Sequence, residues 1–368
     1  MGAAIGAGSV TGAVSVGGSS AGGGRGAAQA SARKRVVTGQ VKRMLIHYMK
    51  TSMPVLFVFV DGVGVGARDQ AVNPLARGDF LLSQFADGTG ALLPRGGRAG
   101  LADACLGVPG RPQSATGQAT ILTGENAPRS IGHHLLGFPN APLRELLLRR
   151  SLFRALAEAG LSATFANAYP VAYLRALGLP CRGEPEPELT FGRRRPRASA
   201  TTVAFSAGAG AFRTWADARV GRGLTHDITG VRASGHGAGI PPRSPRAAAE
   251  ILLGLAAGHD LALFEFFETD EAGHGQSMER ALEALSRLDA FLRALVAGLP
   301  EAWSLVVVSD HGNVEDLSSR NHTLAKVPVL AFGPAAARVH AVRDLTDIRP
   351  LLTTLAGGSS LPPSTAGG

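Results

Sequence analysis

Metal-binding side chains occur at four places in this sequence where an apolar run ends or is about to begin. Aspartate or histidine follows three of the runs directly, and a further histidine lies just ahead of another. The residues are Asp61, Asp270, His274, Asp310, His311 and His322. Taken singly, such a residue can be an aspartate that caps a turn, one half of a local hydrogen-bonded pair or an ordinary loop histidine. Six oxygen and nitrogen donors in the same kind of position are about the number that two divalent ions need.

The apolar runs that must position these residues are predicted to be buried strands. Residues 55–60, 261–267, 305–308 and 327–332 are short, continuous and rich in β-branched or aromatic side chains. In an open α/β sheet, ligands gather beyond the carboxyl ends of the strands. Asp310 and His311 would point to opposite faces of a regular strand, so the chain must bend there for both to converge. Gly312 permits that bend.

Helical patterns alternate with the strands. Apolar residues recur at helical spacing over residues 142–160, 246–257, 277–299 and 346–355, and a further strand is predicted at residues 163–168. This alternation predicts an α/β fold with a mostly parallel sheet. Residues 170–240 are instead rich in proline, glycine and arginine. We therefore expect a core of residues 53–169 and 241–368 with a small inserted cap or elaborated loop at 170–240.

The charge of the chain is concentrated in its first segment. The formal net charge is +9, and residues 1–52 hold seven basic residues and no acid. That segment is rich in glycine, alanine and serine, so we expect a disordered basic extension, with a start at Met53 or a functional basic tail as the alternatives. Because the remainder is nearly neutral, a nucleic-acid partner is not favoured. No apolar run has the length of a membrane span and no secretion signal is evident, so a cytoplasmic protein is expected.

Ser114 is the candidate nucleophile. It lies in the small, polar segment 110–118, ahead of a short helix-like stretch. At a helix amino end, free backbone N–H groups and the helix dipole favour an anion such as a phosphoryl group. Taken alone, the residue is better explained as a helix N-cap. The nearby segment 62–67 also fits a loose dinucleotide-binding pattern, but Asn73-Pro74 interrupts the helix that such a site requires, so that reading is disfavoured.

The chain resembles the alkaline phosphatase superfamily, especially its metalloenzyme branch of cofactor-independent phosphoglycerate mutase and phosphopentomutase. The resemblance covers about residues 54–128 and 260–356 and implies a three-layer alkaline-phosphatase-like core. It is carried by a D-H-G-N segment at 310–313, an Asp-x-x-x-His pair at 270–274, an H-T-x-x-x-x-P segment at 322–328 and a serine nine residues before the threonine of a Thr-Gly pair.

The resemblance implies a division of the ligands between two ions. One ion would be held by Asp61, Asp310, His311 and the nucleophile Ser114. The other would be held by Asp270, His274 and His322. Histidine and carboxylate ligands without thiolate suit manganese or zinc. A divalent cation beside Ser114 would lower the pKa of its hydroxyl, so the resemblance favours a nucleophile over a cap.

The substrate is less well defined. The mutase has a histidine where this chain has Gln118, a mutase lysine has no counterpart between residues 244 and 260, and the cap is shorter. Arg111, Gln118, His226 and Asp227 are predicted to bind substrate, although His226 and Asp227 could instead form a local structural hydrogen bond.

The sequence thus predicts phosphoryl transfer on a small phosphorylated metabolite by a phosphomutase or phosphomonoesterase, through a phosphoserine. The alternatives are a phosphodiesterase or sulfatase of the same superfamily, and a catalytically silent protein that binds a phosphorylated ligand.

Overall fold

The computed structural model describes residues 53–181, 195–208 and 210–357. The basic extension expected at residues 1–52 lies outside the described residues. Within them, helices and strands alternate around a six-stranded sheet, which confirms the predicted α/β class. None of the described helices combines the length and apolarity needed to cross a membrane.

The central sheet is mainly parallel. Its strands lie in the order β2-β8-β7-β1-β6-β3. Their bounds are Arg98–Ala102 (β2), Val327–Phe332 (β8), Ser304–Ser309 (β7), Val55–Val60 (β1), Leu261–Phe266 (β6) and Ala163–Phe165 (β3). β1 pairs in parallel with β6 and β7, and β3 pairs in parallel with β6. β8 is antiparallel to both of its neighbours, so it starts at the edge where β1, β6 and β7 end.

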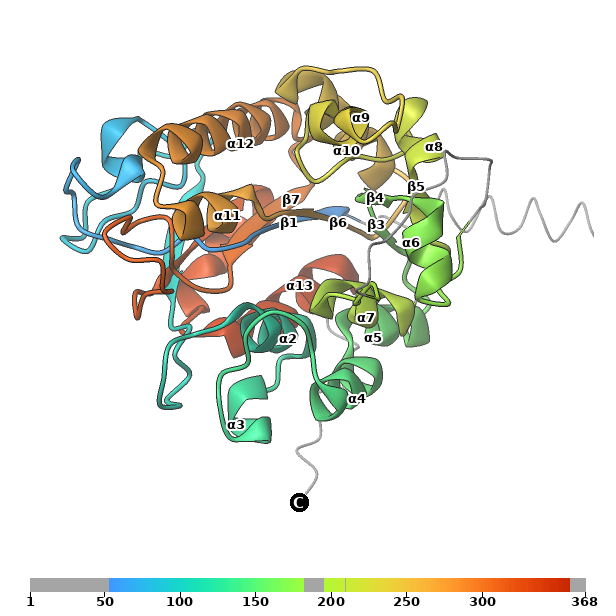
Figure 1. The fold of residues 1–368 in the computed structure, drawn as a ribbon, viewed down its shortest axis with the longest axis horizontal. Helices are drawn as coiled ribbons and strands as arrows, with labels where there is room; N and C mark the ends of the chain where they lie inside the picture. Colours follow the sequence, from blue (N-terminus) through green and yellow to red (C-terminus); the bar gives the residue numbers. More distant parts are fainter. Residues whose placement is uncertain (1–52, 182–194, 209, 358–368) are drawn as a thin grey trace, which may run out of the picture. The chain divides into compact units, whose positions relative to one another are not determined.

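Helices cover both faces of the sheet and complete three layers (Figure 1). One face carries α10 (Pro245–Ala256) and α12 (Met278–Gly298). Serine caps both helices: Ser244 accepts a hydrogen bond from the Ala247 N–H, and Ser277 accepts one from Arg280 N–H. The helices of the opposite face are α2 (Ser114–Thr123), α4 (Ala141–Arg150), α5 (Leu152–Glu158), α7 (Ala200–Ser206) and α13 (Ile348–Gly357).

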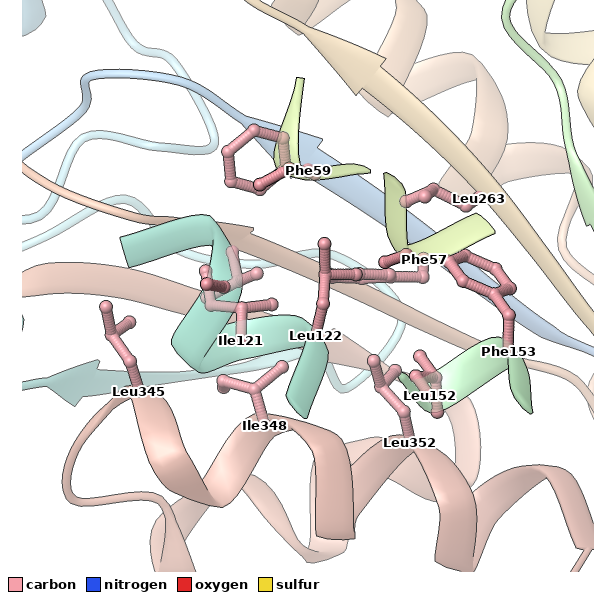
Figure 2. Close-up of a cluster of buried hydrophobic side chains, with 14 of the residues drawn as sticks. Phe57, Phe59, Ile121, Leu122, Leu152, Phe153, Leu263, Leu345, Ile348 and Leu352 are labelled. Carbon is pink, nitrogen blue, oxygen red and sulfur yellow. The ribbon is translucent and has the colours of Figure 1, made fainter. Parts of the chain in front are cut away.

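Alternation along β1 joins the two helical layers to the sheet. Phe57 and Phe59 face the layer of α2, α5 and α13, while Leu56 and Val58 face α10 and α12. All six residues of β1 are buried, as expected for a central parallel strand covered on both faces. Figure 2 shows Phe57 and Phe59 packed over side chains of the lower helices. Burial of each such side chain contributes about 1.5–3 kcal/mol, and this packing fixes β1, and with it Asp61.

Shorter elements lie between β3 and α10. They are β4 (Ala168–Tyr169), α6 (Val171–Ala176), α7, β5 (Arg213–Thr214), α8 (Trp215–Arg219) and α9 (Val231–Gly235). β4 and β5 form a separate parallel pair. α7 packs against α2, α4 and α5. Part of the segment expected to form a cap therefore belongs to the helical layer that contains α2 and α13.

Three local expectations were wrong or incomplete. The helix expected at residues 142–160 is divided at Ser151, which accepts from the Phe153 N–H and donates to the Ala204 carbonyl oxygen, so α4 and α5 are separate helices. The strand expected at 163–168 ends at Phe165 and resumes as β4. β2 was not anticipated, because its largely exposed sequence lacks an apolar run.

The remaining described helices are short. They comprise η1 (Pro74–Arg77), α3 (Ala127–Ile131), α11 (Glu268–Gly275), η2 (Gly333–Ala337), η3 (Val339–Ala341) and η4 (Leu345–Asp347). No helix opens directly behind Gly62–Ala67 among the described residues.

Candidate metal centre

Asp61 is fixed at the end of β1 by contacts with the β6–α11 connection. Its N–H donates to the Phe266 carbonyl oxygen at 2.8 Å, and its own carbonyl accepts from the Thr269 hydroxyl at 2.5 Å. Gly62 follows with φ +72°, and a Cβ there would lie 2.7 Å from Asp270 Cβ. Glycine is required because the turn is left-handed and the β1 loop approaches α11 closely.

Asp310 and His311 occupy the end of β7, and both are fully buried. His311 Nε2 lies 3.2 Å from Asp61 Oδ1 and 3.5 Å from Asp310 Oδ2. The predicted bend after Ser309 therefore exists, since both adjacent side chains reach the same point as Asp61. Gly117 of α2 allows close packing here, because a Cβ at this residue would lie 2.9 Å from the Asp310 carbonyl oxygen.

Asp270 and His274 lie one turn apart on α11, and His322 approaches them from the segment ahead of β8. His274 Nε2 is 3.2 Å from Asp270 Oδ2 and 3.2 Å from His322 Nε2. His322 Nε2 is 3.5 Å from Asp270 Oδ1. Donor atoms of Asp270, His311 and His322 lie within 4.8 Å of one another, as do those of Asp61, Asp310 and His311. The two predicted ligand sets are thus adjacent, with His311 close to both.

Ser114 is the first residue of α2, and its Oγ lies 2.9 Å from His311 Nε2. The N-cap of this helix is Gln113, whose side chain makes no capping hydrogen bond. The alternative that Ser114 is simply the N-cap is therefore wrong. Its hydroxyl faces the candidate metal centre from a helix amino end, where backbone N–H groups are free to bind an anion.

The three histidines of the candidate metal centre all turn the same ring nitrogen, Nδ1, toward the backbone. Each places Nδ1 near a backbone carbonyl oxygen: Gly312 at 3.4 Å for His311, Arg320 at 2.8 Å for His274 and Pro112 at 2.9 Å for His322. This arrangement favours a proton on Nδ1 and leaves Nε2 as the electron-pair donor. In all three residues Nε2 is the atom turned toward the neighbouring carboxylates and Ser114, as metal ligation requires.

The protein groups around the buried carboxylates of Asp61 and Asp310 do not supply enough positive charge to stabilise the ionised forms. Burial, reinforced by Asp270, raises the pKa of Asp61 well above its ordinary value, and burial together with Asp61 does the same to the pKa of Asp310. Asp61 Oδ1 and Asp310 Oδ2 are buried acceptors without a hydrogen-bond donor. Orphaned anionic oxygens are costly unless a cation compensates them, so these residues fit a divalent ion.

The second ligand set is polarised by the Asp270–His274 pair. Burial raises the pKa of Asp270, but hydrogen bonding to His274 and the neighbouring imidazoles outweigh it and bring the pKa to about 2. The same hydrogen bond raises the pKa of His274 to about 9. Burial, with His311 nearby, lowers the pKa of His322 to about 4. In the metal-free protein this pair therefore favours a proton on His274 Nε2, and a metal ion would take the place of that proton.

Glu315 joins the loops that carry the ligands, and its role was not anticipated. This buried carboxylate accepts from the Gly64 N–H at 2.8 Å, from the Asn313 N–H at 2.7 Å and from the Thr323 hydroxyl. It therefore connects the loop after Asp61, the loop after His311 and the segment of His322. A Cβ at Gly64 or Gly312 would overlap its side chain. The available signal was an acidic residue close behind Asp310 and His311, two of the predicted ligands.

Asn313 is a second unanticipated contributor. Its Nδ2 donates to Asp270 Oδ1 at 2.6 Å, while its fully buried side chain packs against Gly273 of α11. It thereby orients one predicted ligand from the loop that carries two others. In the D-H-G-N segment the aspartate and histidine belong to the first predicted ligand set, whereas the asparagine contacts Asp270 of the second.

The four residues predicted to bind substrate are dispersed. Arg111 is exposed, three residues before Ser114. Gln118 is buried on α2 among Phe57, Phe59 and Thr201, beneath the sheet. His226 and Asp227 line a separate pocket beside α11. The local hydrogen bonds of this pair are to Asn167 and Thr229 rather than to each other.

Known proteins are similar in sequence to the part of this chain that carries the carboxyl-terminal residues of the site. The Metalloenzyme superfamily matches residues 243–358, which contain Asp270, His274, Asp310, His311 and His322. The 2,3-bisphosphoglycerate-independent phosphoglycerate mutase of Cereibacter sphaeroides is 33% identical over 121 residues, which are 30% of this chain and 24% of the mutase. The enzyme of the same name from Halobacterium salinarum is 32% identical over 128 residues, 32% of this chain and 25% of that protein. The match thus spans about a quarter of the length of these mutases.

A solved structure agrees over a larger part of the fold. The PH0037 protein from Pyrococcus horikoshii has a TM-score of 0.51 and 15% identity, covering 86% of this chain and all of that one. Fold and site together define a metalloenzyme-like α/β protein. The predicted resemblance to the metalloenzyme branch of the alkaline phosphatase superfamily is confirmed, with its sequence support in residues 243–358.

Proposed function

We propose that this chain is a metal-dependent phosphoryl-transfer enzyme, a phosphomutase or phosphomonoesterase, that acts on a small phosphorylated metabolite through Ser114. The observation that carries the proposal is the position of Ser114 Oγ, which lies at a helix amino end and 2.9 Å from Nε2 of a predicted metal ligand. A hydroxyl at this point has both a source of activation and backbone donors for a phosphoryl group.

Two divalent ions, manganese or zinc, would be held by the seven residues described above. Asp61, Asp310, His311 and Ser114 Oγ would hold one ion, and Asp270, His274 and His322 the other. When bound, the ions supply positive charge that lowers the pKa of the serine hydroxyl and stabilises charge on the transferring phosphoryl group. The orphaned oxygens of Asp61 and Asp310 and the common orientation of the histidines support this assignment.

The reaction on Ser114 consists of two displacements. As the Oγ–phosphorus bond forms, the bond between phosphorus and the ester oxygen breaks; the serine proton is released and the departing oxygen takes up a proton. Free N–H groups of the first turn of α2 would bind the phosphoryl oxygens. Attack by water on the phosphoserine gives inorganic phosphate, whereas attack by another hydroxyl of the retained substrate gives an isomer. Both routes restore the Ser114 hydroxyl.

The test is a turnover assay of protein reconstituted with manganese or zinc. Phosphorylated sugars, phosphoglycerates and simple phosphomonoesters would be scored for free phosphate and for isomerised product, with a phosphodiester and a sulfate ester for comparison. We expect monoester turnover, and an acid-quenched sample should carry a phosphoryl group on the peptide containing Ser114.

Ser114→Ala should abolish turnover. Metal analysis should still find bound ions, because the carboxylate and imidazole ligands of the metal centre are unchanged in this variant. Ser130→Ala is the matched control, since Ser130 is exposed and only donates to Asn126. Undiminished turnover by Ser114→Ala would contradict the role of this serine. Full activity in verified metal-free protein would exclude the metal-dependent mechanism, and exclusive turnover of the diester or the sulfate ester would replace the proposed substrate class.

A further inference from the structure

An aromatic pocket lies beside the candidate metal centre. The exposed ring of His236 lines it, and so do four further rings, from Tyr169 at the end of β4, Trp215 at the start of α8, His226 in the following loop and Phe267 just before α11. We call these four residues the ring pocket. Phe267 precedes Asp270 by three residues, so about 5 Å of helix rise separates the pocket wall from a predicted metal ligand.

The His226 ring is held in a defined orientation. The Asn167 side chain pairs with the backbone of Glu265, accepting from its N–H at 2.8 Å and donating to its carbonyl oxygen at 2.8 Å. These two bonds fix the orientation of the amide, so Asn167 Nδ2 donates its other hydrogen to His226 Nδ1 at 2.9 Å. Nδ1 is therefore an acceptor, and in the neutral ring Nε2 carries the hydrogen.

The neutral form of His226 is favoured by its surroundings. Burial lowers the pKa of His226 to about 4. Its ring contacts Tyr169 edge-on at a centroid distance of 5.1 Å and lies 4.7 Å from the Phe267 ring. The pocket thus presents aromatic surface with an imidazole N–H in its wall.

The charged groups around the ring pocket are engaged with protein partners. Arg232 binds Glu271 through two nitrogens at 2.6 and 3.1 Å and also approaches Glu268. The Asp227 carboxylate accepts from the Thr229 hydroxyl at 2.8 Å and from Arg232 N–H at 3.1 Å. These contacts offset the opposite charges within the protein, so the pocket suits a neutral group rather than a second phosphate.

The size of the pocket limits its occupant. Its volume is about 170 Å³, close to the roughly 150 Å³ of an apolar cavity that holds benzene. That space accommodates a single six-membered ring. A sugar ring would need partners for several hydroxyls, whereas a flat aromatic ring with one acceptor needs chiefly apolar walls and the His226 N–H.

We propose that the ring pocket binds an aromatic ring carried by the alcohol portion of the phosphate ester, while the phosphoryl group lies at Ser114. This inference rests on the proposed function, because it assigns the two ends of one substrate to neighbouring sites. It places substrate selection at Tyr169, Trp215, His226 and Phe267, and the chemical step at the strand ends.

Three pocket variants of the metal-loaded enzyme test the inference by kinetics. The readout is the ratio of kcat/KM for benzyl phosphate to that for ethyl phosphate, which share the reacting group and differ in the ring. We expect a ratio of at least about ten in the wild type, because ring burial should favour the benzyl ester. Ala233→Leu, which fills the pocket from α9, should bring the ratio close to one. Trp215→Leu should lower it, and Trp215→Phe should restore most of it. Val220→Ala is the control, since Val220 is 61% exposed at the end of α8.

A binding experiment separates the failure of this inference from failure of the proposed function. The chain has two tryptophans, so Trp303→Phe leaves Trp215 as the sole tryptophan. Saturable quenching of Trp215 fluorescence by p-nitrobenzyl alcohol, lost in the Trp303→Phe/Ala233→Leu double variant, is expected whether or not any ester turns over. Quenching without turnover would support the pocket and overturn the enzyme assignment. Turnover with an unchanged substrate ratio in both Ala233→Leu and Trp215→Leu, or quenching unaffected by Ala233→Leu, would overturn the ring pocket as a substrate site.

Discussion

The candidate metal centre and the ring pocket are linked at the start of α11, where Phe267 precedes Asp270 by three residues, but they are built by different means. The metal centre stands on long, fully buried strands whose loops are joined by Glu315 and Asn313. The ring pocket is assembled from two-residue strands and five-residue helices, and is held by aromatic contacts and the Asn167 amide. Rigid strand ends suit ligands that must be placed within tenths of an ångström, whereas short elements can vary without disturbing them. The elements proposed to carry the chemistry and those proposed to select the substrate are thus structurally distinct.

The largest effect on activity should come from Asp310→Asn, which tests that separation. The substitution keeps the shape of the side chain but removes one anionic ligand, so metal affinity and turnover should fall by more than about 100-fold, the upper range for loss of an outer-shell partner. Isothermal titration with manganese or zinc, together with the monoester assay, measures both. Quenching of Trp215 by p-nitrobenzyl alcohol should stay within twofold of its original strength.

Asp79→Asn is the control for that experiment, because the Asp79 side chain is 86% exposed. The metal-free Asp310→Asn protein should also melt at a higher temperature than metal-free wild type, since a buried carboxylate near Asp61 has been removed. Unchanged metal affinity in Asp310→Asn would remove this residue from the ligand set. A parallel loss of ring binding would show that the two regions are not separable.

Glu315→Gln should have an intermediate effect confined to the metal centre. The amide can still accept from Gly64 and Asn313 and can face the Thr323 hydroxyl, so the fold should persist, but the charge that joins the three loops is lost. We expect metal affinity to fall by about 10–100-fold, as is typical for outer-shell partners of metal ligands, with the benzyl-to-ethyl preference retained. Thr323→Val, which removes one of the three donors, should lie between wild type and Glu315→Gln. Equal metal affinity in all three proteins would show that Glu315 does not position the ligands.

Glu265→Gln should have the smallest effect on turnover and a pH-dependent effect on stability. Glu265 is buried on β6 between the two regions, and burial raises its pKa from 4.5 to about 7, although the Thr201 hydroxyl bonds it. Because the folded state favours the protonated acid, its contribution to stability is complete below pH 4.5 and is lost as the pH rises through 7. That loss amounts to about 3 kcal/mol. Glutamine does not titrate, so the variant should gain this amount relative to wild type between pH 4.5 and 8.

Urea unfolding of both proteins across this pH range measures the difference, with Glu250→Gln, on the exposed face of α10, as the control. A stability difference independent of pH would mean that Glu265 is not a buried titrating acid. Metal loading should reduce the difference, because a cation beside Asp61 also favours the ionised form of Glu265.

The buried strands β1, β6, β7 and β8 were the most predictable part of the fold. β1 and β8 have the predicted bounds, because a continuous apolar run that ends in a polar residue has little alternative to a buried strand. α10 and α12 agree to within one residue at each end, since serine caps mark their beginnings. The break at Ser151 was missed because the apolar periodicity continues across it. The helix ends there because the Ser151 hydroxyl donates to the Ala204 carbonyl oxygen of α7, a contact between distant parts of the chain.

The sequence by itself determined which residue types meet at the edge of the sheet, since a strand delivers whatever follows it to a fixed place. Asp61, Asp270 and Asp310 could be proposed as neighbours for that reason. Only the tertiary structure decided how His322 joins them: β8 runs antiparallel, so its amino end comes to the edge where β1, β6 and β7 finish. Only the tertiary structure brought Tyr169, Trp215, His226 and Phe267 around one cavity. Their spacing in the chain follows no period, because short elements are placed by contacts with the rest of the fold rather than by local geometry.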